Sequence, residues 1–327
     1  MKLEKGVTLV ELLISLVISL LLASAVYALY ISTSEQAART RHISNMFQSA
    51  QAAMQVMTGM IQQSAYGLNT ANCFTYNMPA GGGITTAYTF SVAGTGGASQ
   101  SLNLAYAPSG ITLPAVGTFG QLTNSSLIPD QNGMILASAP PACAISQLNA
   151  GVVQTGQINA LLTAQGVSSG NISNAALYYL GSSSSGTFLN YTFQILNEPI
   201  PGGSPVSVPS LVLSASNPFQ PGAAVTQQVL ASNVVDLQML CGYFSGSNQT
   251  TYGTCTGNPD TLRAIQIYLL ARSGPFRTYN APASIQIVPA IGGNPAVTYV
   301  IPMGFTNYRY QLLQTTLLLK NYLWAAS

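Results

Sequence analysis

Residues 1–31 read MKLEKGVTLVELLISLVISLLLASAVYALYI, and this stretch decides how the rest of the chain is interpreted. A short polar segment precedes about 25 largely apolar residues, from Val7 to Ile31, which are enough to cross a bilayer as a helix. The triplet Ala23-Ser24-Ala25 resembles a signal-peptide cleavage site, but neither proline nor glycine follows it before Arg41. The unbroken helical pattern therefore favours a retained membrane span over a removed signal peptide.

Residues at the two ends of this span predict its orientation. Lys2 and Lys5 precede the span, and basic residues favour the cytoplasmic side, so the N-terminus is expected inside and the bulk of the chain outside. Tyr27 and Tyr30 lie at the opposite end, where aromatic rings are enriched at the membrane surface. We therefore expect a single-pass membrane protein.

Glu11 is the only charged residue between Val7 and Ile31. A carboxylate inside an apolar span costs about 2.5–3.5 kcal/mol on insertion scales, and such residues commonly have a specific partner. The alternative is that the side chain reaches back to the nearby membrane surface. Its place in the span makes Glu11 a candidate assembly residue.

The order Lys5-Gly6 followed by VTLVELLI, residues 7–14, resembles the prepilin signature of type IV pilins and type II secretion pseudopilins. The resemblance implies that residues 1–6 are a leader, that prepilin peptidase cuts between Gly6 and Val7, and that the new amino group of Val7 is methylated. Val7 departs from the family, in which this residue is usually Phe. Glu11 matches the family's glutamate, whose carboxylate would meet the Val7 amine of a neighbouring subunit and so be paired only on assembly.

The helix is expected to continue beyond the membrane. An apolar stripe with spacings of three and four is formed by Ile43, Phe47, Ala50, Met54, Met57 and Ile61. Glu35 and Arg39 add a favourable i,i+4 ion pair, and Gly67 is a candidate terminal cap. We predict one helix of about 55 residues, membrane-spanning over residues 7–31 and amphipathic over residues 32–67.

The pattern changes at Leu68. Short apolar or alternating stretches separated by proline and glycine predict antiparallel strands and no second long helix. Residues 68–222 form a Gly/Ser/Asn-rich β insert, and residues 223–327 form a C-terminal β-sheet region. The expected strands are Thr86–Val92, Leu102–Ala107, Ala176–Leu180, Phe188–Leu196, Val206–Leu213, Val234–Leu240, Leu262–Ala271, Ile285–Val288, Val297–Ile301 and Tyr308–Leu319.

Four further segments look like parts of the PilW family of minor pilins and shade into the J-type pseudopilins of type II secretion. They are Met60–Gly67 (MIQQSAYG), Asn233–Gln238 (NVVDLQ), Leu262–Ser273 (LRAIQIYLLARS) and Tyr308–Asn321 (YRYQLLQTTLLLKN). The resemblance implies an α+β, pilin-like fold, in which the long helix packs as a spine against an antiparallel β-sheet domain with a large insert. It also implies a structural subunit near the tip of a type IV pilus that primes pilus assembly, with twitching motility and adhesion as associated functions.

The same resemblance implies a location and a set of partners. The chain would sit in the bacterial inner membrane, with its bulk in the periplasm, before it joins the extracellular pilus. Its partners would be membrane lipid, the prepilin peptidase, the inner-membrane assembly platform, other minor pilins and the major pilin. Two alternatives stay open: a J-type pseudopilin of a type II secretion system, and a tip adhesin or DNA-binding subunit whose insert contacts a surface.

The chain has four cysteines, Cys73, Cys143, Cys241 and Cys255, which allow three pairings. They lack Cys-x-x-Cys spacing, so disulfides in an oxidising compartment are expected rather than a zinc site. We favour Cys241 with Cys255, because the segment between them is short, contains glycines, and would close a hairpin between two expected strands. Cys73 would then pair with Cys143 and join the insert to the end of the helix.

The composition argues against catalysis. Only 5% of the residues are charged, against about 25% in a typical domain, and His42 is the only histidine. We therefore expect no catalytic residue, no metal and no cofactor. The arginines after residue 262 form no dense cluster, so they are expected on solvated strand faces, and nucleic acid is not an expected partner. Because the chain has so few titrating groups, we also predict that its stability depends weakly on pH and that the folded protein tolerates acid.

Overall fold

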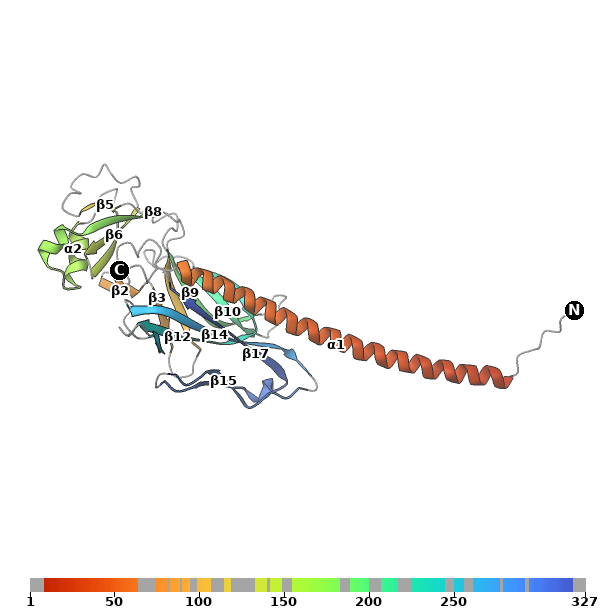
Figure 1. Ribbon diagram of the computed structural model, residues 1–327. Helices are drawn as coiled ribbons and strands as arrows, with labels where there is room; N and C mark the ends of the chain where they lie inside the picture. Colours follow the sequence, from red (N-terminus) through yellow and green to blue (C-terminus); the bar gives the residue numbers. More distant parts are fainter. Residues whose placement is uncertain are drawn as a thin grey trace.

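The computed structural model describes one long α-helix, two short α-helices, a 3-10 turn and four β-sheets (Figure 1). The predicted α+β, pilin-like fold is confirmed. The described residues are 9–63, 75–80, 83–88, 90–94, 99–106, 115–118, 133–139, 142–148, 155–182, 189–199, 207–216, 225–244, 250–255, 261–276, 279–291 and 294–319.

The long helix α1 runs without a break from Leu9 to Gln63, 55 residues, as the sequence predicted. Its first half projects away from the rest of the protein, and its second half lies against the β-sheets (Figure 1). The buried side chains of α1 all come from this second half: Met46, Ala50, Ala53, Met54, Met57 and Ile61. They recur at spacings of three and four, so a single face of the helix meets the domain. The proposed cap Gly67 lies outside the described residues.

The predicted apolar stripe is wrong at one residue. Phe47 was expected to be buried, but 43% of it is exposed, and Met46 is buried in its place. Neighbouring helical residues differ by about 100° around the axis, so the two positions cannot both face the sheet centre. The buried face is thus rotated slightly from the one that the sequence pattern suggested, and Phe47 lies at its border.

Two antiparallel sheets hold the second half of α1. The five-stranded sheet has the order β11-β10-β9-β4-β3, and the four-stranded sheet has the order β13-β12-β14-β17. The helix contacts β11, β14, β17 and β4, and its buried side chains share one hydrophobic core with both sheets. The strands are β3 (Phe90–Ala93), β4 (Ser101–Tyr106), β9 (Leu189–Pro199), β10 (Ser207–Ser216), β11 (Thr226–Ser232), β12 (Val234–Phe244), β13 (Thr250–Gly253), β14 (Leu262–Pro275) and β17 (Tyr308–Leu318).

Asn233 makes the crossing from one sheet to the other. It separates β11 from β12 and has φ of 61°, a left-handed conformation that asparagine tolerates better than most residues. Its carbonyl accepts a hydrogen bond of 2.8 Å from the Arg272 N–H of β14. This tight connection lets consecutive strands enter two different sheets beneath the same helix.

A six-stranded sheet forms a separate unit at the end of the protein farthest from the N-terminus (Figure 1). It packs against two short helices, α2 (Thr155–Thr163) and α3 (Ser169–Ser173), around a core of its own that includes Ile158, Leu161 and Leu162. In sheet order, its strands are β2 (Gly83–Tyr88), β1 (Thr75–Ala80), β7 (Ala142–Gln147), β6 (Gly133–Ala139), β8 (Ala176–Ser182) and β5 (Ala115–Thr118). This unit will be called the distal unit.

The insert predicted over residues 68–222 therefore contributes to two sheets. Its strands β3, β4, β9 and β10 join the core beneath α1, whereas the others build the distal unit. The single strand predicted over Thr86–Val92 is wrong, because β2 and β3 belong to different sheets. The helices α2 and α3 were not predicted. The predicted strands from Leu102 onward correspond to β4, β8, β9, β10, β12, β14, β15, β16 and β17, with ends shifted by a few residues.

A two-stranded hairpin covers part of the outer face of the four-stranded sheet. It consists of β15 (Ser284–Val288) and β16 (Val297–Val300), followed by the 3-10 turn η4 (Met303–Phe305). Ile287 and Val288 of the hairpin pack with Leu240, Tyr268 and Leu270 of the sheet. The four-stranded sheet is therefore covered on both faces, by α1 on one side and in part by this hairpin on the other.

Candidate functional site

The apolar half of α1 carries the first candidate site. Every described residue from Leu9 to Ile31 is exposed, including Leu9 at 78% and Tyr30 at 68%. Within the described residues, α1 is the one helix whose length and hydropathy suffice for a membrane span, and its most apolar window is wholly unburied. A surface of this kind is stable only in an apolar surrounding, such as lipid or the helices of other subunits.

Glu11 lies in the first turn of this exposed half. An acidic side chain there interacts favourably with the N-terminal end of the helix dipole. The predicted cleavage and methylation residues, Gly6 and Val7, lie outside the described residues. The structure thus places Glu11 at the far end of the projecting helix, well separated along it from the β domain (Figure 1).

The serine hydroxyl groups within the apolar half donate hydrogen bonds to the helix backbone. Ser15 donates to the carbonyl of Leu12 at 2.9 Å, Ser19 donates to the carbonyl of Ser15 at 2.6 Å, and Ser24 donates to the carbonyl of Leu21 at 2.8 Å. Such bonds remove the cost of placing a free hydroxyl in lipid. The serines therefore do not prevent this half of the helix from entering a membrane.

After Glu11, the next charged side chains of α1 lie beyond the apolar half. Arg39 and Glu35 form the predicted i,i+4 pair, with 3.5 Å between Nη2 and Oε2. Both side chains are partly exposed, so the pair contributes little to stability. Their positions show that the polar part of α1 has begun by Glu35.

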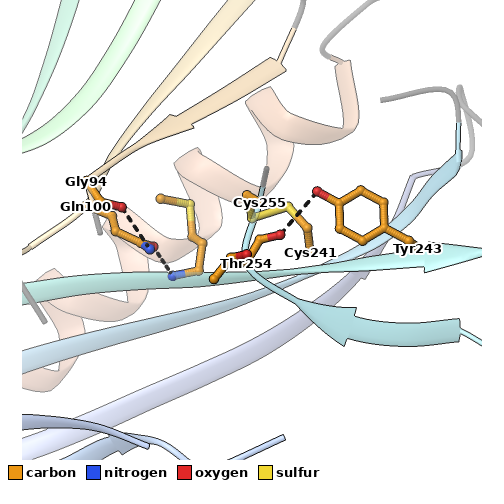
Figure 2. Close-up of a disulfide and its surroundings, with 7 residues drawn as sticks. Gly94, Gln100, Cys241, Tyr243, Thr254 and Cys255 are labelled. Atoms are coloured by element: carbon orange, nitrogen blue, oxygen red, sulfur yellow. Dashed lines mark hydrogen bonds between the residues drawn. A yellow bond between two sulfur atoms is a disulfide. The ribbon is translucent and has the colours of Figure 1, made fainter. Parts of the chain in front are cut away.

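The structure brings Cys241 of β12 and Cys255 together in a disulfide, with 4.9 Å between their Cα atoms (Figure 2). The bond closes a loop around β13, which pairs with the end of β12. Cys143 in β7 is also disulfide-bonded, and its predicted partner Cys73 lies outside the described residues. Cys241 itself is fully buried in the core beneath α1.

Gln100 ties the two sheets together beside this disulfide (Figure 2). Its Oε1 accepts a hydrogen bond of 2.6 Å from the Met239 N–H, and its own N–H donates to the carbonyl of Leu237 at 2.8 Å. A cavity of about 440 Å³ opens here, with Gln100, Gln238, Thr254, Val288 and Asn294 among its walls. Among the described residues, these walls carry no charged side chain, so they offer apolar surface and amide groups but no acid or base.

The outer face of the four-stranded sheet buries two charged residues that sequence reasoning did not single out. Asp236 is 2% exposed, and burial raises the pKa of its carboxyl group against the opposing effect of a hydrogen bond from Gln238. The prediction that the C-terminal arginines lie on solvated faces is wrong for Arg272, which is 6% exposed. The alternating pattern of β12 and β14 could have indicated this, because both residues lie within long apolar strands.

Aromatic rings lie over the guanidinium group of Arg272. Its Cζ atom lies 4.1 Å from the centre of the Phe305 ring and 5.1 Å from that of Tyr308. Nearby, burial raises the pKa of Tyr310 to about 12. This cluster joins η4 to β14 and β17.

A helix that is half exposed and apolar, and half buried across antiparallel sheets, is the arrangement of a type IV pilin-like protein. Residues 1–27 match the family model described as the prokaryotic N-terminal methylation motif. This match supports a type IV pilin or pseudopilin subunit. The comparison with curated proteins gave no match, and neither did the comparison with solved structures. Among the described residues, no three His, Cys, Asp or Glu side chains gather in a way that could hold a metal ion.

Proposed function

We propose that this chain is a minor pilin similar to the PilW family, a structural subunit that primes assembly of a type IV pilus. The carrying observation is that a methylation motif over residues 1–27 precedes a 55-residue helix with one apolar, exposed half and one half packed in a β domain. The exposed half offers a surface to lipid before assembly and to other helices afterwards. No part of this role requires catalysis, and we propose none.

The proposed location follows from the same helix. Before assembly, the apolar half would span the bacterial inner membrane with its N-terminus in the cytoplasm and the β domain in the periplasm. Disulfide formation at Cys241 and Cys255 supports a compartment outside the cytoplasm. After cleavage between Gly6 and Val7, the subunit would leave the membrane and enter the extracellular filament.

The distal unit supports a position at the pilus tip. It adds a six-stranded sheet with its own core at the end of the protein opposite the N-terminus (Figure 1). In a filament of parallel helices, a subunit enlarged at that end leaves less room for another subunit beyond it. Other minor pilins and the major pilin would therefore join below, with the prepilin peptidase and the inner-membrane assembly platform acting earlier.

Mass spectrometry of the mature chain tests the first step of this proposal. We expect an N-terminus at Val7 carrying one added methyl group, with the span retained. A chain that starts after Ala25, or that keeps Met1, would contradict the pilin assignment.

Deletion of the gene tests the second step. We expect the loss or a strong reduction of surface pili, restored by the wild-type gene, and labelling of the tagged protein at filament ends. If deletion instead blocks protein secretion and leaves pili unchanged, the chain acts as a pseudopilin. If pili remain but no longer adhere, the adhesin alternative is favoured.

A further inference from the structure

The strand β17 leaves one edge of the four-stranded sheet open. It is the last strand in the order β13-β12-β14-β17, and among the described strands only β14 pairs with it. It is 11 residues long, whereas the other edge strands of the described sheets, β2, β3, β5, β11, β13, β15 and β16, have four to seven residues. Short edges resist pairing with other chains, and a long edge invites it.

The hydrogen-bond pattern shows which backbone groups face outward. The Leu319 N–H donates to the carbonyl of Arg263 at 2.9 Å, and bonds to an antiparallel neighbour recur at every second residue. The residues that bond to β14 are thus the odd-numbered ones. The N–H and C=O groups of Leu312, Gln314, Thr316 and Leu318 point away from the sheet, and no backbone partner for them exists among the described residues.

This edge also lacks the features that usually protect one. Between Tyr310 and Leu318 it contains no proline and no charged residue, and over this part its pairing with β14 is regular, since the one register shift lies before it, between Tyr308 and Tyr310. Natural sheets commonly block such edges with lysine, proline or a bulge. At the end of the strand, 62% of Leu318 is exposed, which adds apolar surface to the row of free backbone groups.

We propose that the β17 edge accepts an extended strand from a different subunit of the filament, which adds to the sheet through backbone hydrogen bonds. This proposal rests on the proposed function. The occupant would be an uncharged segment of about four to eight residues, because the edge offers backbone groups and apolar or amide side chains but no ion-pair partner from Tyr310 to Leu318. A second copy of this chain fits less well, because pairing identical edges closes a two-fold dimer that cannot continue a head-to-tail filament.

The test is photo-cross-linking in cells that produce the full-length protein. A photo-cross-linking amino acid replaces Leu318 at the edge, and the control carries it at Val300, which is 72% exposed on the hairpin β15–β16. We expect Leu318 to give a cross-link to an extended segment of one other filament subunit, and Val300 to give none to that segment. Absence of a product above the Val300 control, or a product that contains only two copies of this chain, would overturn the proposal.

A matched pair of variants at Thr316 separates backbone pairing from side-chain contact. Thr316→Ala keeps the outward N–H and should retain the cross-link, whereas Thr316→Pro removes the N–H and should lower it about fivefold or more. Formation of the Cys241–Cys255 disulfide reports whether each variant folds. If Thr316→Pro does not fold, the proposal is judged from the Leu318 cross-link in the otherwise wild-type chain. Equal loss in both variants would contradict strand addition.

The same experiment keeps the two proposals apart. If the chain is present in sheared filaments but Leu318 gives no cross-link, the proposed function stands and the edge proposal fails. If the chain is absent from filaments, the proposed function fails, and the membrane fraction then shows whether the edge is occupied by another protein.

Discussion

Gln238 donates a hydrogen bond of 3.0 Å from Nε2 to Oδ1 of Asp236, and each of these two residues is only 2% exposed. They stand two residues apart on β12 and so share the outer face of the sheet. The hydrogen bond stabilises the carboxylate, but burial opposes it more strongly, and the pKa of Asp236 is therefore raised above 3.8. A buried acid with a raised pKa gives this protein an unusual response to acid.

We predict that acid stabilises the folded protein through Asp236. Because its folded pKa exceeds its unfolded value of 3.8, the stabilisation is fully present below that value and is lost as the pH rises through the folded pKa. The wild type should gain stability relative to Asp236→Asn as the pH falls from about 7 to about 4, by about 1.4 kcal/mol for each unit of pKa difference. Thermal unfolding of both proteins in detergent over this range measures the effect, and a difference that does not change with pH would refute it.

We predict that Met57→Ala destabilises the protein by about 2–5 kcal/mol, because Met57 is fully buried between α1 and the sheets. Phe47→Ala is the matched control on the same helix. It should cost much less, because 43% of Phe47 is exposed. Denaturant unfolding in detergent gives both values. A larger cost for Phe47→Ala would mean that the buried face of α1 is assigned incorrectly.

Removal of the Cys241–Cys255 disulfide should cost about 3 kcal/mol, since the two cysteines are 14 residues apart and the bond restricts the unfolded chain. The double variant Cys241→Ala with Cys255→Ala tests this without leaving a free thiol. Its free energy of unfolding should match that of the single variant Cys255→Ala within about 1 kcal/mol. A double variant as stable as the wild type would show that the bond does not stabilise the fold.

Glu11→Gln should leave the protein inserted, cleaved and folded but reduce its incorporation into filaments. The carboxylate lies at the far end of the apolar half of α1, so its loss does not alter the β domain, and a neutral residue enters lipid more easily. The control is Glu35→Gln, which removes a helical glutamate from the partly exposed pair with Arg39. Counting sheared pili in deletion strains complemented with each variant compares Glu11→Gln with Glu35→Gln. Normal incorporation of Glu11→Gln into filaments would mean that the charge has no assembly role.

The long helix was predictable because its signals are local. Spacings of three and four residues from Met54 to Ile61, and the absence of proline and glycine between Val7 and Gly59, depend on neighbours along the chain only. The Cys241–Cys255 pair was predictable for the same reason, since both cysteines flank one short hairpin.

The rest depends on contacts distant in sequence. The division of the insert into two sheets is set by pairings such as Asn103 with Thr192, which no local pattern encodes. The helix α2 has nine residues, too few to show a strong periodic signal. Arg272 is buried because η4, more than 30 residues later, brings Phe305 over its guanidinium group.

The way α1 joins the β domain determines how the protein carries mechanical load. The buried helix residues run from Met46 to Ile61, about 23 Å along the axis, whereas the helix before them extends by about 55 Å. A pull along the helix therefore reaches the domain as shear across this one apolar contact, in which all the buried side chains resist together. The disulfide joins Cys241 to Cys255 within the β domain and not to α1, so it would hold that part of the sheet together even while the helix slides. Under tension, we expect the first element to yield to be the seam between α1 and the sheets.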